Sequence, residues 1–480
     1  MTMQAAEDYA SWTVEKYNHT IAGVVGYRRH FAYGVLVAVL AATAVSIMIS
    51  NFKTVADVYG RATYTPVEWV VVLWLLPLPI MLWRGWVYLR TFHPPTLAWN
   101  PGAGHGHRVI FQVTTTGEPA ETVVHTARSV AHWRRKLDPA FAVEIWVVAE
   151  PWGHAPHRGT YEQLAREGVN VLVVPKTYSC PNGSVRKARA LQYAVDLRRE
   201  WGYDPTTTWV YHQDDETAVG EDTFAGIAEF LDAHADEPCV GTGIILYPQH
   251  ADGWRPSAVA DLNRSKDDIA NIYSLTRTNR ASQFHGSHYL VRCDVETAIG
   301  FDAGPALSVV DDLTFEVRAR ARYGNLVRPL AGFAYEQSPL TWRDQIKQRR
   351  RWVVGLKAAE KNLDMPLVRK LSLAYYLTAW AAGAASTFTI LLPVVFNFDA
   401  VLPFGMTVSA VSWSLMVWGY VVGYRFHREY VAPARPVWRV VWNGVVGAGV
   451  DAVAVWVGLF ASNRGFEVVK KDADAAPERP

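Results

Sequence analysis

The sequence has few cysteines, few charged residues and almost no excess of either charge sign. Its three cysteines, Cys180, Cys239 and Cys293, lie far apart and form no CxxC pair, which excludes a disulfide framework and a thiolate metal cluster. Charged residues make up 19% of the chain, below the roughly 25% of an average soluble domain, so a disordered, strongly charged chain is excluded. The formal net charge of +2 is too small for a protein that neutralises duplex phosphates, and nucleic acid is not an expected partner.

Half of the residues are hydrophobic, and many of them lie in long runs that predict membrane-spanning helices. Residues 31–50 carry no charge over 20 positions, which is enough to cross a hydrocarbon layer of about 30 Å. Four further candidate spans are 69–89, 371–398, 400–424 and 440–463. We therefore expect a multi-pass membrane protein, and the excess of arginine over lysine favours a bacterial plasma membrane.

Basic residues beside the first two spans predict a cytosolic N-terminus and a cytosolic middle region. Arg28 and Arg29 precede the first span, and Arg84 and Arg90 close the second. The fifth span contains one acid, Asp451, so either this segment is re-entrant or the C-terminal tail lies outside the cell. Both alternatives stay open at this point.

The composition divides the chain into six regions. They are a cytosolic N-terminal segment (1–30), two transmembrane helices (31–90), a cytosolic domain in which we expect the chemistry (91–340), a basic amphipathic interfacial region (341–370), three transmembrane or re-entrant helices (371–463) and a polar tail (464–480). Within the middle region, β-branched runs at 108–113, 142–149, 169–174 and 207–213 alternate with helical patterns at about 120–137 and 185–200. This alternation predicts an α/β fold with parallel strands, which binds ligands beyond the carboxyl ends of those strands.

Two groups of adjacent carboxylates are candidates for chemistry. Asp214, Asp215 and Glu216 follow the last of these strands, and their mutual repulsion is unfavourable without a cation. Oxygen ligands suit Mg²⁺ or Mn²⁺, although a solvated acidic turn accounts for the same residues. Asp311 and Asp312 precede a helical pattern, and N-capping explains them unless other evidence assigns them a reaction.

Two basic segments are candidates for binding phosphate. Residues 342–361 interleave arginine and lysine with tryptophan and aliphatic residues at near-helical spacing. This pattern is typical of an interfacial helix on anionic lipid, and a clamp for a diphosphate is the alternative. Arg186, Lys187 and Arg189 open a predicted helix after Gly183, where cations and free N–H groups would meet an anion. Ordinary solvated helix residues explain the second segment equally well.

Taken in order, these motifs resemble those of inverting family 2 glycosyltransferases with the GT-A fold. Asp214-Asp215-Glu216 resembles the Asp-x-Asp metal motif, Asp311-Asp312 resembles the motif of the catalytic base, and residues 348–352 fit Gln-x-x-Arg-Trp. The closer resemblance is to the egghead-type β-1,4-mannosyltransferases. It is carried by the segments 174–178, 187–193, 286–287, 335–339, 456–460 and 466–470.

The resemblance implies transfer of one sugar, most closely mannose from GDP-mannose, to a lipid-linked acceptor in β linkage at a membrane. It implies Asp312 as the base, Asp311 as the residue that orients it, and a divalent metal, Mg²⁺ or Mn²⁺, on Asp214 and Glu216. Donor contacts are implied for Thr114, Glu118, Glu150, Lys187, Asp214, Gln348, Arg351 and Trp352, and acceptor contacts for Gly286, Ser287, His288 and Trp352. Glu150 and Glu216 depart from the family pattern, because the family has Asp at both positions.

Two other functions fit part of the sequence. A processive polysaccharide synthase that uses a UDP-sugar has the same three motifs, and the length of the product would distinguish it. A transporter or receptor that only binds nucleotide sugar would carry acids in several spans. Asp451 is the only acid within the expected C-terminal spans, which disfavours this second alternative.

Overall fold

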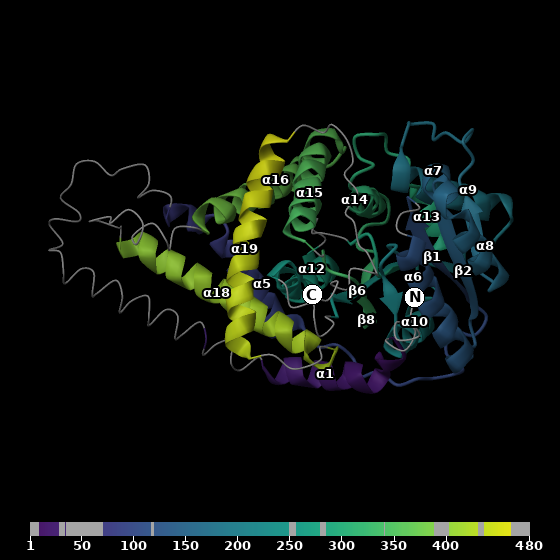
Figure 1. Cartoon of the computed structure of the whole chain (residues 1–480), viewed down its shortest axis with the longest axis horizontal. Helices are drawn as coiled ribbons and strands as arrows, with labels where there is room; N and C mark the ends of the chain where they lie inside the picture. The colour runs from purple at the N-terminus through teal and green to yellow at the C-terminus, as the bar shows by residue number, and fades with distance from the viewer. Residues whose placement is uncertain are drawn as a thin grey trace, which may run out of the picture.

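The computed structural model describes residues 9–27, 34, 71–116, 120–248, 256–278, 285–339, 341–387, 403–430 and 436–461. Three predictions therefore lie outside the described residues: nearly all of the span at 31–50, the donor contact Glu118 and the tail 464–480. The described chain has a sheet with covering helices at one end and a group of longer helices at the other (Figure 1).

Eight strands form one mixed sheet in the order β3-β2-β1-β4-β7-β6-β8-β5. Their bounds are β1 Arg108–Thr115, β2 Ala142–Ala149, β3 Asn170–Val173, β4 Thr208–Gln213, β5 Ala218–Val219, β6 Val240–Leu246, β7 Tyr289–Arg292 and β8 Val327–Tyr335. β3, β2, β1 and β4 are parallel, which confirms the α/β reading of the four β-branched runs. β7 is antiparallel to both β4 and β6, so the second half of the sheet is mixed.

Shorter helices cover the sheet and connect its strands. Their bounds are η2 Tyr9–Ser11, α6 Ala120–Leu137, α7 Pro151–His154, η4 Ala155–His157, α8 Arg158–Arg166, α9 Arg186–Glu200, α10 Glu221–His234, α13 Cys293–Ile299 and α14 Asp311–Tyr323. Alternate side chains of a strand point to opposite faces. Val109, Phe111 and Val113 of β1 therefore pack in the core with α6, α8 and α10, whereas Ile110 packs with α9 on the other face.

A second group of helices, which includes the long helices α15, α16, α18 and α19, lies beside the β6–β8 half of the sheet (Figure 1). Their bounds, with those of short 3₁₀ turns, are α1 Val14–Gly26, η3 Val71–Leu75, α5 Leu78–Thr91, α11 Pro256–Leu262, α12 Arg264–Thr278, α15 Trp342–Asn362, α16 Leu367–Ser386, α18 Pro403–His427, η6 Arg428–Tyr430 and α19 Val437–Phe460. α12 contacts both β6 and α18, and α15 packs along α19. The expected catalytic and membrane regions thus share one packed structure.

The N-terminal segment is part of this structure. α1 contacts α18, α10 and β8, and its residues Tyr17, Ile21 and Val24 are buried with Phe333 and Phe426. Burying an amphipathic face of this kind stabilises a helix that would be marginal alone. Residues 14–26 therefore belong to the fold of the sheet and the helices.

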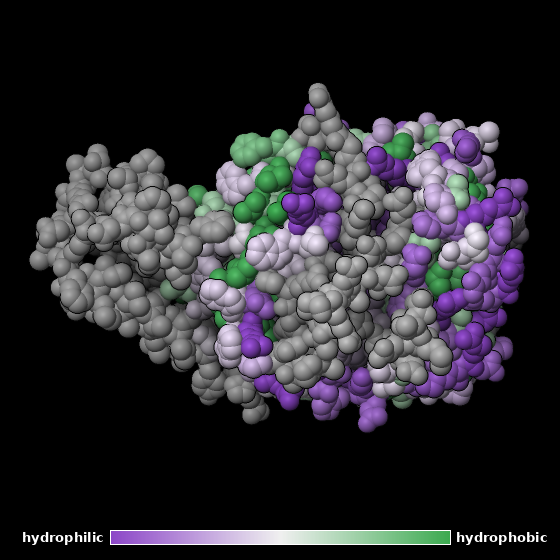
Figure 2. All heavy atoms as spheres, in the orientation of Figure 1, coloured by the Kyte–Doolittle hydropathy of each residue, from purple (hydrophilic) through white to green (hydrophobic). Residues whose placement is uncertain are grey.

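The expected membrane spans are only partly confirmed. Among the described residues, α19 is the one helix that is long and apolar enough to cross a membrane, as judged by length and composition. The expected span at 69–89 is divided at Pro77 into η3 and α5. On the face shown in Figure 2, hydrophobic residues gather over α19 and α16, whereas the surface over the β1–β3 side of the sheet is mainly hydrophilic.

Candidate active site

The carboxyl ends of the parallel strands place several predicted residues along one edge of the sheet. Thr115 at the end of β1 pairs with Ala149 at the end of β2, and Val113 pairs with Gln213 at the end of β4. Glu150 directly follows β2 and Asp214 directly follows β4, so both residues lie beyond this edge of the sheet. This is the edge at which parallel α/β sheets bind ligands.

Three predicted residues, Lys187, Asp214 and Asp312, meet at Gly286 in the segment before β7. A Cβ atom placed on Gly286 would lie 3.1 Å from Nζ of Lys187, 3.6 Å from Oδ2 of Asp312 and 3.8 Å from Oδ1 of Asp214. Lys187, at the start of α9, donates a hydrogen bond to Asp214 and another to the Gly286 carbonyl at 3.4 Å. We call Lys187, Asp214, Gly286, Asp311 and Asp312 the Gly286 cluster.

The charges of the Gly286 cluster depend on one another. Burial and the like charge of Asp311 together raise the pKa of Asp312 to about 6, while Lys187 acts in the opposite direction. Burial also raises the pKa of Asp311, which Lys187 and Arg351 partly oppose. The three aspartates hold the pKa of Lys187 above its usual value despite its burial. A carboxylate with a pKa near 6 is suited to accept a proton at neutral pH.

Asp311 and Asp312 occupy the first turn of α14, and neither is its N-cap. The N-cap is Val310, which makes no side-chain cap hydrogen bond, and Asp312 Oδ1 accepts a hydrogen bond of 2.7 Å from the N–H of Leu313. The positive end of the helix therefore stabilises the ionised aspartates, but capping alone does not explain why both face Lys187.

Asp215 points away from the cluster and lies in a turn, which the hydrogen bond of 3.1 Å from the N–H of Thr217 to the Asp214 carbonyl closes. Its carboxylate accepts a hydrogen bond of 3.3 Å from Thr115, and its carbonyl accepts one of 2.8 Å from Thr126 of α6. Asp214 and Glu216 remain half-exposed. The middle residue of the three is thus tied to the sheet and α6, whereas Asp214 faces Lys187.

The Gln-x-x-Arg-Trp segment lies on α15, with its arginines in different surroundings. Gln348 and Arg349 are buried, and Gln348 Oε1 accepts a hydrogen bond of 2.7 Å from Arg349. Arg349 also pairs with Asp261 of α11 and, at 3.2 Å, with Asp451 of α19. Arg351 is half-exposed and near enough to Asp311 to lower its pKa.

Trp352 lies between two arginines. The guanidinium carbons of Arg349 and Arg264 are 4.2 Å and 5.0 Å from its ring centroid. One turn further on, α15 comes very close to the turn before α14, because a Cβ atom on Gly355 would lie closer than 3.0 Å to Val310. This contact fixes the distance between the Gln-x-x-Arg-Trp segment and the two aspartates.

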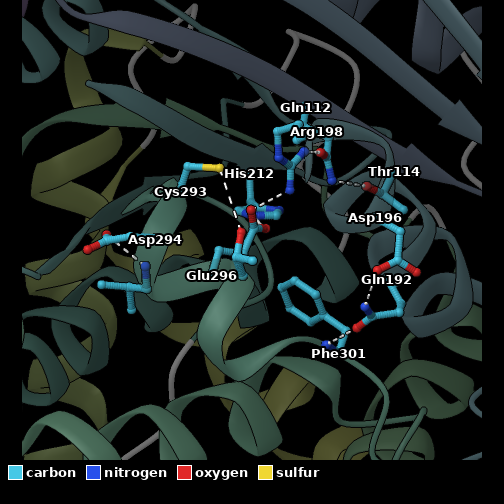
Figure 3. Close-up of polar contacts among 12 residues, drawn as sticks. Gln112, Thr114, Gln192, Asp196, Arg198, His212, Cys293, Asp294, Glu296 and Phe301 are labelled. Carbon is cyan, nitrogen blue, oxygen red and sulfur yellow. Dashed lines mark hydrogen bonds and ion pairs between the residues drawn. The ribbon is translucent and has the colours of Figure 1, made fainter. Parts of the chain in front are cut away.

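Thr114 and His288 are placed within the core. Thr114 is 3% exposed and accepts a hydrogen bond of 3.2 Å from Gln112, which accepts one from Arg198 in a buried network (Figure 3). His288 is fully buried, and its ring nitrogens pair with the hydroxyl of Tyr211 at 2.7 Å and the carbonyl of Gly332 at 3.3 Å. The structure therefore does not bring these two side chains into the Gly286 cluster.

Glu150 is also fully buried. Arg189 of α9 approaches its carboxylate to 3.1 Å, and burial raises its pKa to about 7. Apart from this ion pair, neither carboxylate oxygen accepts a hydrogen bond from the residues that the structure describes. A buried carboxylate of this kind is typical of a ligand-binding site, in line with its predicted donor contact.

Comparison with known proteins finds a glycosyltransferase domain in this chain. The family model described as glycosyl transferase family group 2 matches residues 209–427, from β4 to the end of α18. The chain is 28% identical over 317 residues to the β-1,4-mannosyltransferase egh of Drosophila melanogaster. It is 27% identical over 316 residues to the β-1,4-mannosyltransferase bre-3 of Caenorhabditis elegans, and each match covers 63% of this chain and 67% of the relative. The chain contains a family 2 glycosyltransferase domain.

Solved glycosyltransferase structures are similar at low sequence identity. The mannosyltransferase PcManGT from Pyrobaculum calidifontis, in complex with GDP-Man and Mn²⁺, has a TM-score of 0.45 and 16% identity, covering 81% of this chain and 99% of that chain. Mannosyl-3-phosphoglycerate synthase from Rubrobacter xylanophilus has a TM-score of 0.34 and 14% identity, covering 54% of this chain and 77% of that chain.

Asp214 and Glu216 of this glycosyltransferase fit a metal ion only if water and the substrate supply its remaining ligands. No group of three or more His, Cys, Asp or Glu side chains in the described residues is arranged to hold a metal. Asp214 and Glu216 supply oxygen ligands at the sheet edge, and ions such as Mg²⁺ usually take their remaining ligands from water and a substrate phosphate. The residues therefore fit a cation that is shared with a diphosphate.

Several polar residues of this glycosyltransferase site are absent from the sequence predictions. Glu336 accepts hydrogen bonds from Ser287 and, at 2.9 Å, from Thr217, and Asp214 and Arg264 both affect its pKa. Its segment, residues 335–339, carries the family resemblance, but that resemblance alone did not assign Glu336 a role. His285, Asp268 and Arg264 gave no sequence signal, because their partners are distant in the chain.

Proposed function

We propose that this enzyme transfers one mannose from GDP-mannose to a lipid-linked acceptor, with inversion at the anomeric carbon. The support for mannose is the 26–28% identity to β-1,4-mannosyltransferases over about 316 residues. The support for a reaction centre is the Gly286 cluster, in which a half-buried carboxylate of raised pKa, a lysine and a second acid meet at a glycine. This convergence is the observation on which the proposal depends most.

Asp312 is the general base of the proposed reaction. It takes the proton from a hydroxyl of the acceptor while that oxygen forms a bond to the anomeric carbon. The bond from this carbon to the diphosphate breaks on the opposite face, and GDP leaves with the electron pair. One bond forms as one breaks, so the configuration inverts and no covalent enzyme intermediate is needed.

The negative charge that builds on the diphosphate needs cations. Lys187, whose pKa is held high by the surrounding aspartates, and Arg351, which faces Asp311, are the cations that the chain supplies. Asp214 and Glu216 would hold Mg²⁺ or Mn²⁺, which when bound supplies Lewis-acid stabilisation of the leaving diphosphate. Glu150, at the end of β2, is the proposed contact to the nucleoside.

Helix α19 supports a membrane site for the acceptor. Trp438 and Trp442 near one end and Trp456 and Phe460 near the other are exposed. Trp438 and Trp456 are 18 positions apart, which corresponds to about 27 Å along a helix. This matches the hydrocarbon thickness, and aromatic residues at both ends are typical of spanning helices. The basic helix α15 packs on α19, so an acceptor headgroup at the bilayer surface would lie near Trp352.

The transfer assay tests this function. Purified enzyme is incubated with labelled GDP-mannose and a total lipid extract, and the chloroform-soluble products are analysed by mass spectrometry. We expect a product one hexose heavier than its acceptor. A ladder of longer products would favour a processive synthase, and incorporation from UDP-sugars alone would contradict the donor assignment.

Accessibility tags test the proposed multi-pass arrangement. Tags after residue 10 and within 160–170 should be protected in intact cells, because the basic residues beside the spans favour the cytosol. A tag within 55–60 should be accessible from outside. The reverse pattern would contradict a cytosolic donor site.

A further inference from the structure

A histidine–carboxylate pair, His285 and Asp268, lies beside the Gly286 cluster. Nε2 of His285 is 2.5 Å from Oδ1 of Asp268 in α12. The other carboxylate oxygen of Asp268 accepts a hydrogen bond of 3.1 Å from the N–H of Ile245 in β6. Because Asp268 is tied to the central sheet, it holds the imidazole ring in a fixed direction.

The position of His285 places it on the same side as the base. It directly precedes Gly286, where an added Cβ atom would be 3.6 Å from the Asp312 carboxylate. The side chain of His285 is 17% exposed, whereas that of Asp268 is 1% exposed. The ring of His285 is therefore the more accessible member of the pair.

The other internal histidine–carboxylate pair near the sheet has no such opening. His212 lies 2.8 Å from Glu296, which also pairs with Arg198, and these side chains are at most 2% exposed (Figure 3). That network links β4, α9 and α13 within the core. His285 differs in having its carboxylate buried and its own ring partly accessible.

The charges around His285 favour its protonated form. Burial lowers the pKa of its ring, but the charge and hydrogen bond of Asp268 outweigh this and hold the pKa above the ordinary value. Arg264 opposes protonation and Glu336 favours it. Two further titratable groups lie near His285. The charge of His285 lowers the pKa of Asp312, and burial lowers the pKa of His288 to about 4. The protonated ring, in which both nitrogens carry a hydrogen and can donate, is thus favoured at a position close to the base.

We propose that His285, oriented by Asp268, is an acceptor-binding residue, which donates a hydrogen bond to an acceptor oxygen next to the hydroxyl that Asp312 deprotonates. This inference rests on the proposed glycosyl transfer, but not on the identity of the sugar. It explains why a histidine and a buried aspartate, rather than an isolated polar residue, stand at this position: the pair fixes both the direction and the charge of the donor.

The substitution His285→Gln tests the role by separating acceptor from donor. The variant keeps a hydrogen-bonding group but loses the charge and the fixed direction, so we expect the half-saturating concentration of a total lipid extract in mixed micelles to rise at least tenfold. The KM for the nucleotide sugar and the slow hydrolysis of that sugar by water should change less than twofold, because neither needs the acceptor. The matched control is His234→Gln, which removes a histidine–glutamate pair of 2.7 Å on α10 and should change none of these values.

Asp268→Asn provides a second, independent variant. Without the carboxylate, His285 should lose its proton near or below its ordinary pKa of about 6.5. The half-saturating lipid concentration of the Asp268→Asn enzyme should therefore rise between pH 5.5 and 8. That of the unsubstituted enzyme should stay nearly constant until a higher pH. A merely structural role would lower thermal stability without producing this pH dependence.

Three results would overturn the inference: unchanged lipid saturation in His285→Gln, a fall in kcat alone, or a parallel loss of hydrolysis and transfer in a folded variant. If GDP-mannose is not the donor, the result is different, because the unsubstituted enzyme would then use another nucleotide sugar or none. If it uses another, the same comparison of variants is made with that sugar. An enzyme that uses none contradicts the proposed function and, with it, an acceptor role for His285.

Discussion

Gly355→Ala tests whether the packing of α15 against the turn before α14 sets the geometry of the active site. The new Cβ atom would lie closer than 3.0 Å to Val310, whereas carbon atoms need about 3.5–4.0 Å. Because Val310 is itself buried with Leu313 and Leu356, the helix has to move by at least about 0.5 Å. The movement shifts the Gln-x-x-Arg-Trp segment away from the catalytic aspartates.

The expected cost in stability is modest, and the expected cost in rate is large. Overpacking costs about 1–3 kcal/mol, of which the better helix propensity of alanine returns about 1 kcal/mol. A displacement of about 1 Å in the site can lower the rate about 100-fold. We therefore expect a drop in the initial rate of labelled-sugar transfer of between about 10-fold and 100-fold, with a small change in Tm.

Two further variants make this result decisive. Gly159→Ala on α8 introduces the same methyl group where nothing lies within 4 Å, and it should leave the rate unchanged. The double variant Gly355→Ala/Val310→Ala removes the obstructing methyl groups and should recover most of the rate. Normal transfer by Gly355→Ala, or no recovery in the double variant, would refute the reasoning.

Further predictions concern the Gly286 cluster. Gly286→Ala places a methyl group among three charged side chains and should lower transfer at least tenfold with little change in Tm; an unchanged rate would exclude this position from the reaction centre. Asp214→Ala and Glu216→Ala should each abolish the metal dependence of donor binding measured by calorimetry, whereas Asp215→Ala should be milder, and full activity in excess EDTA would contradict both. Because the base must be ionised and the pKa of Asp312 is raised to about 6, kcat/KM should fall about tenfold per pH unit below 6; a rate that stays flat down to pH 4.5 would argue against it.

The strands and the order of the site motifs could be predicted from sequence because they depend on local patterns. The run at 142–149 coincides with β2, and the helical pattern at 120–137 coincides with α6. The sequence also predicts that Asp214 and Asp215 point in different directions, and their contacts agree, although a turn at 214–217 rather than an extended chain separates them. In both cases the neighbours along the chain determine the result.

Partners that are distant in sequence could not be predicted in this way. Composition does not distinguish Arg349 from Arg351, yet the first is buried between Asp261 and Asp451 of two other helices. The sequence presents Asp451 as an acid in an apolar segment, and only the packing of α19 on α15 supplies its cation. His288 was expected at the acceptor, but Tyr211 and Gly332 satisfy its ring within the core.

Asp312→Asn tests the central claim most directly, because it keeps the size of the side chain and removes its ability to accept a proton. Transfer from labelled GDP-mannose to a total lipid extract and donor affinity by calorimetry are measured on the same folded preparation. We predict a fall in transfer of at least about 1,000-fold, with a change in donor Kd of less than about threefold, since the base acts mainly in the transition state. Near-normal transfer by this variant would contradict the assignment of Asp312 and of the Gly286 cluster as the reaction centre.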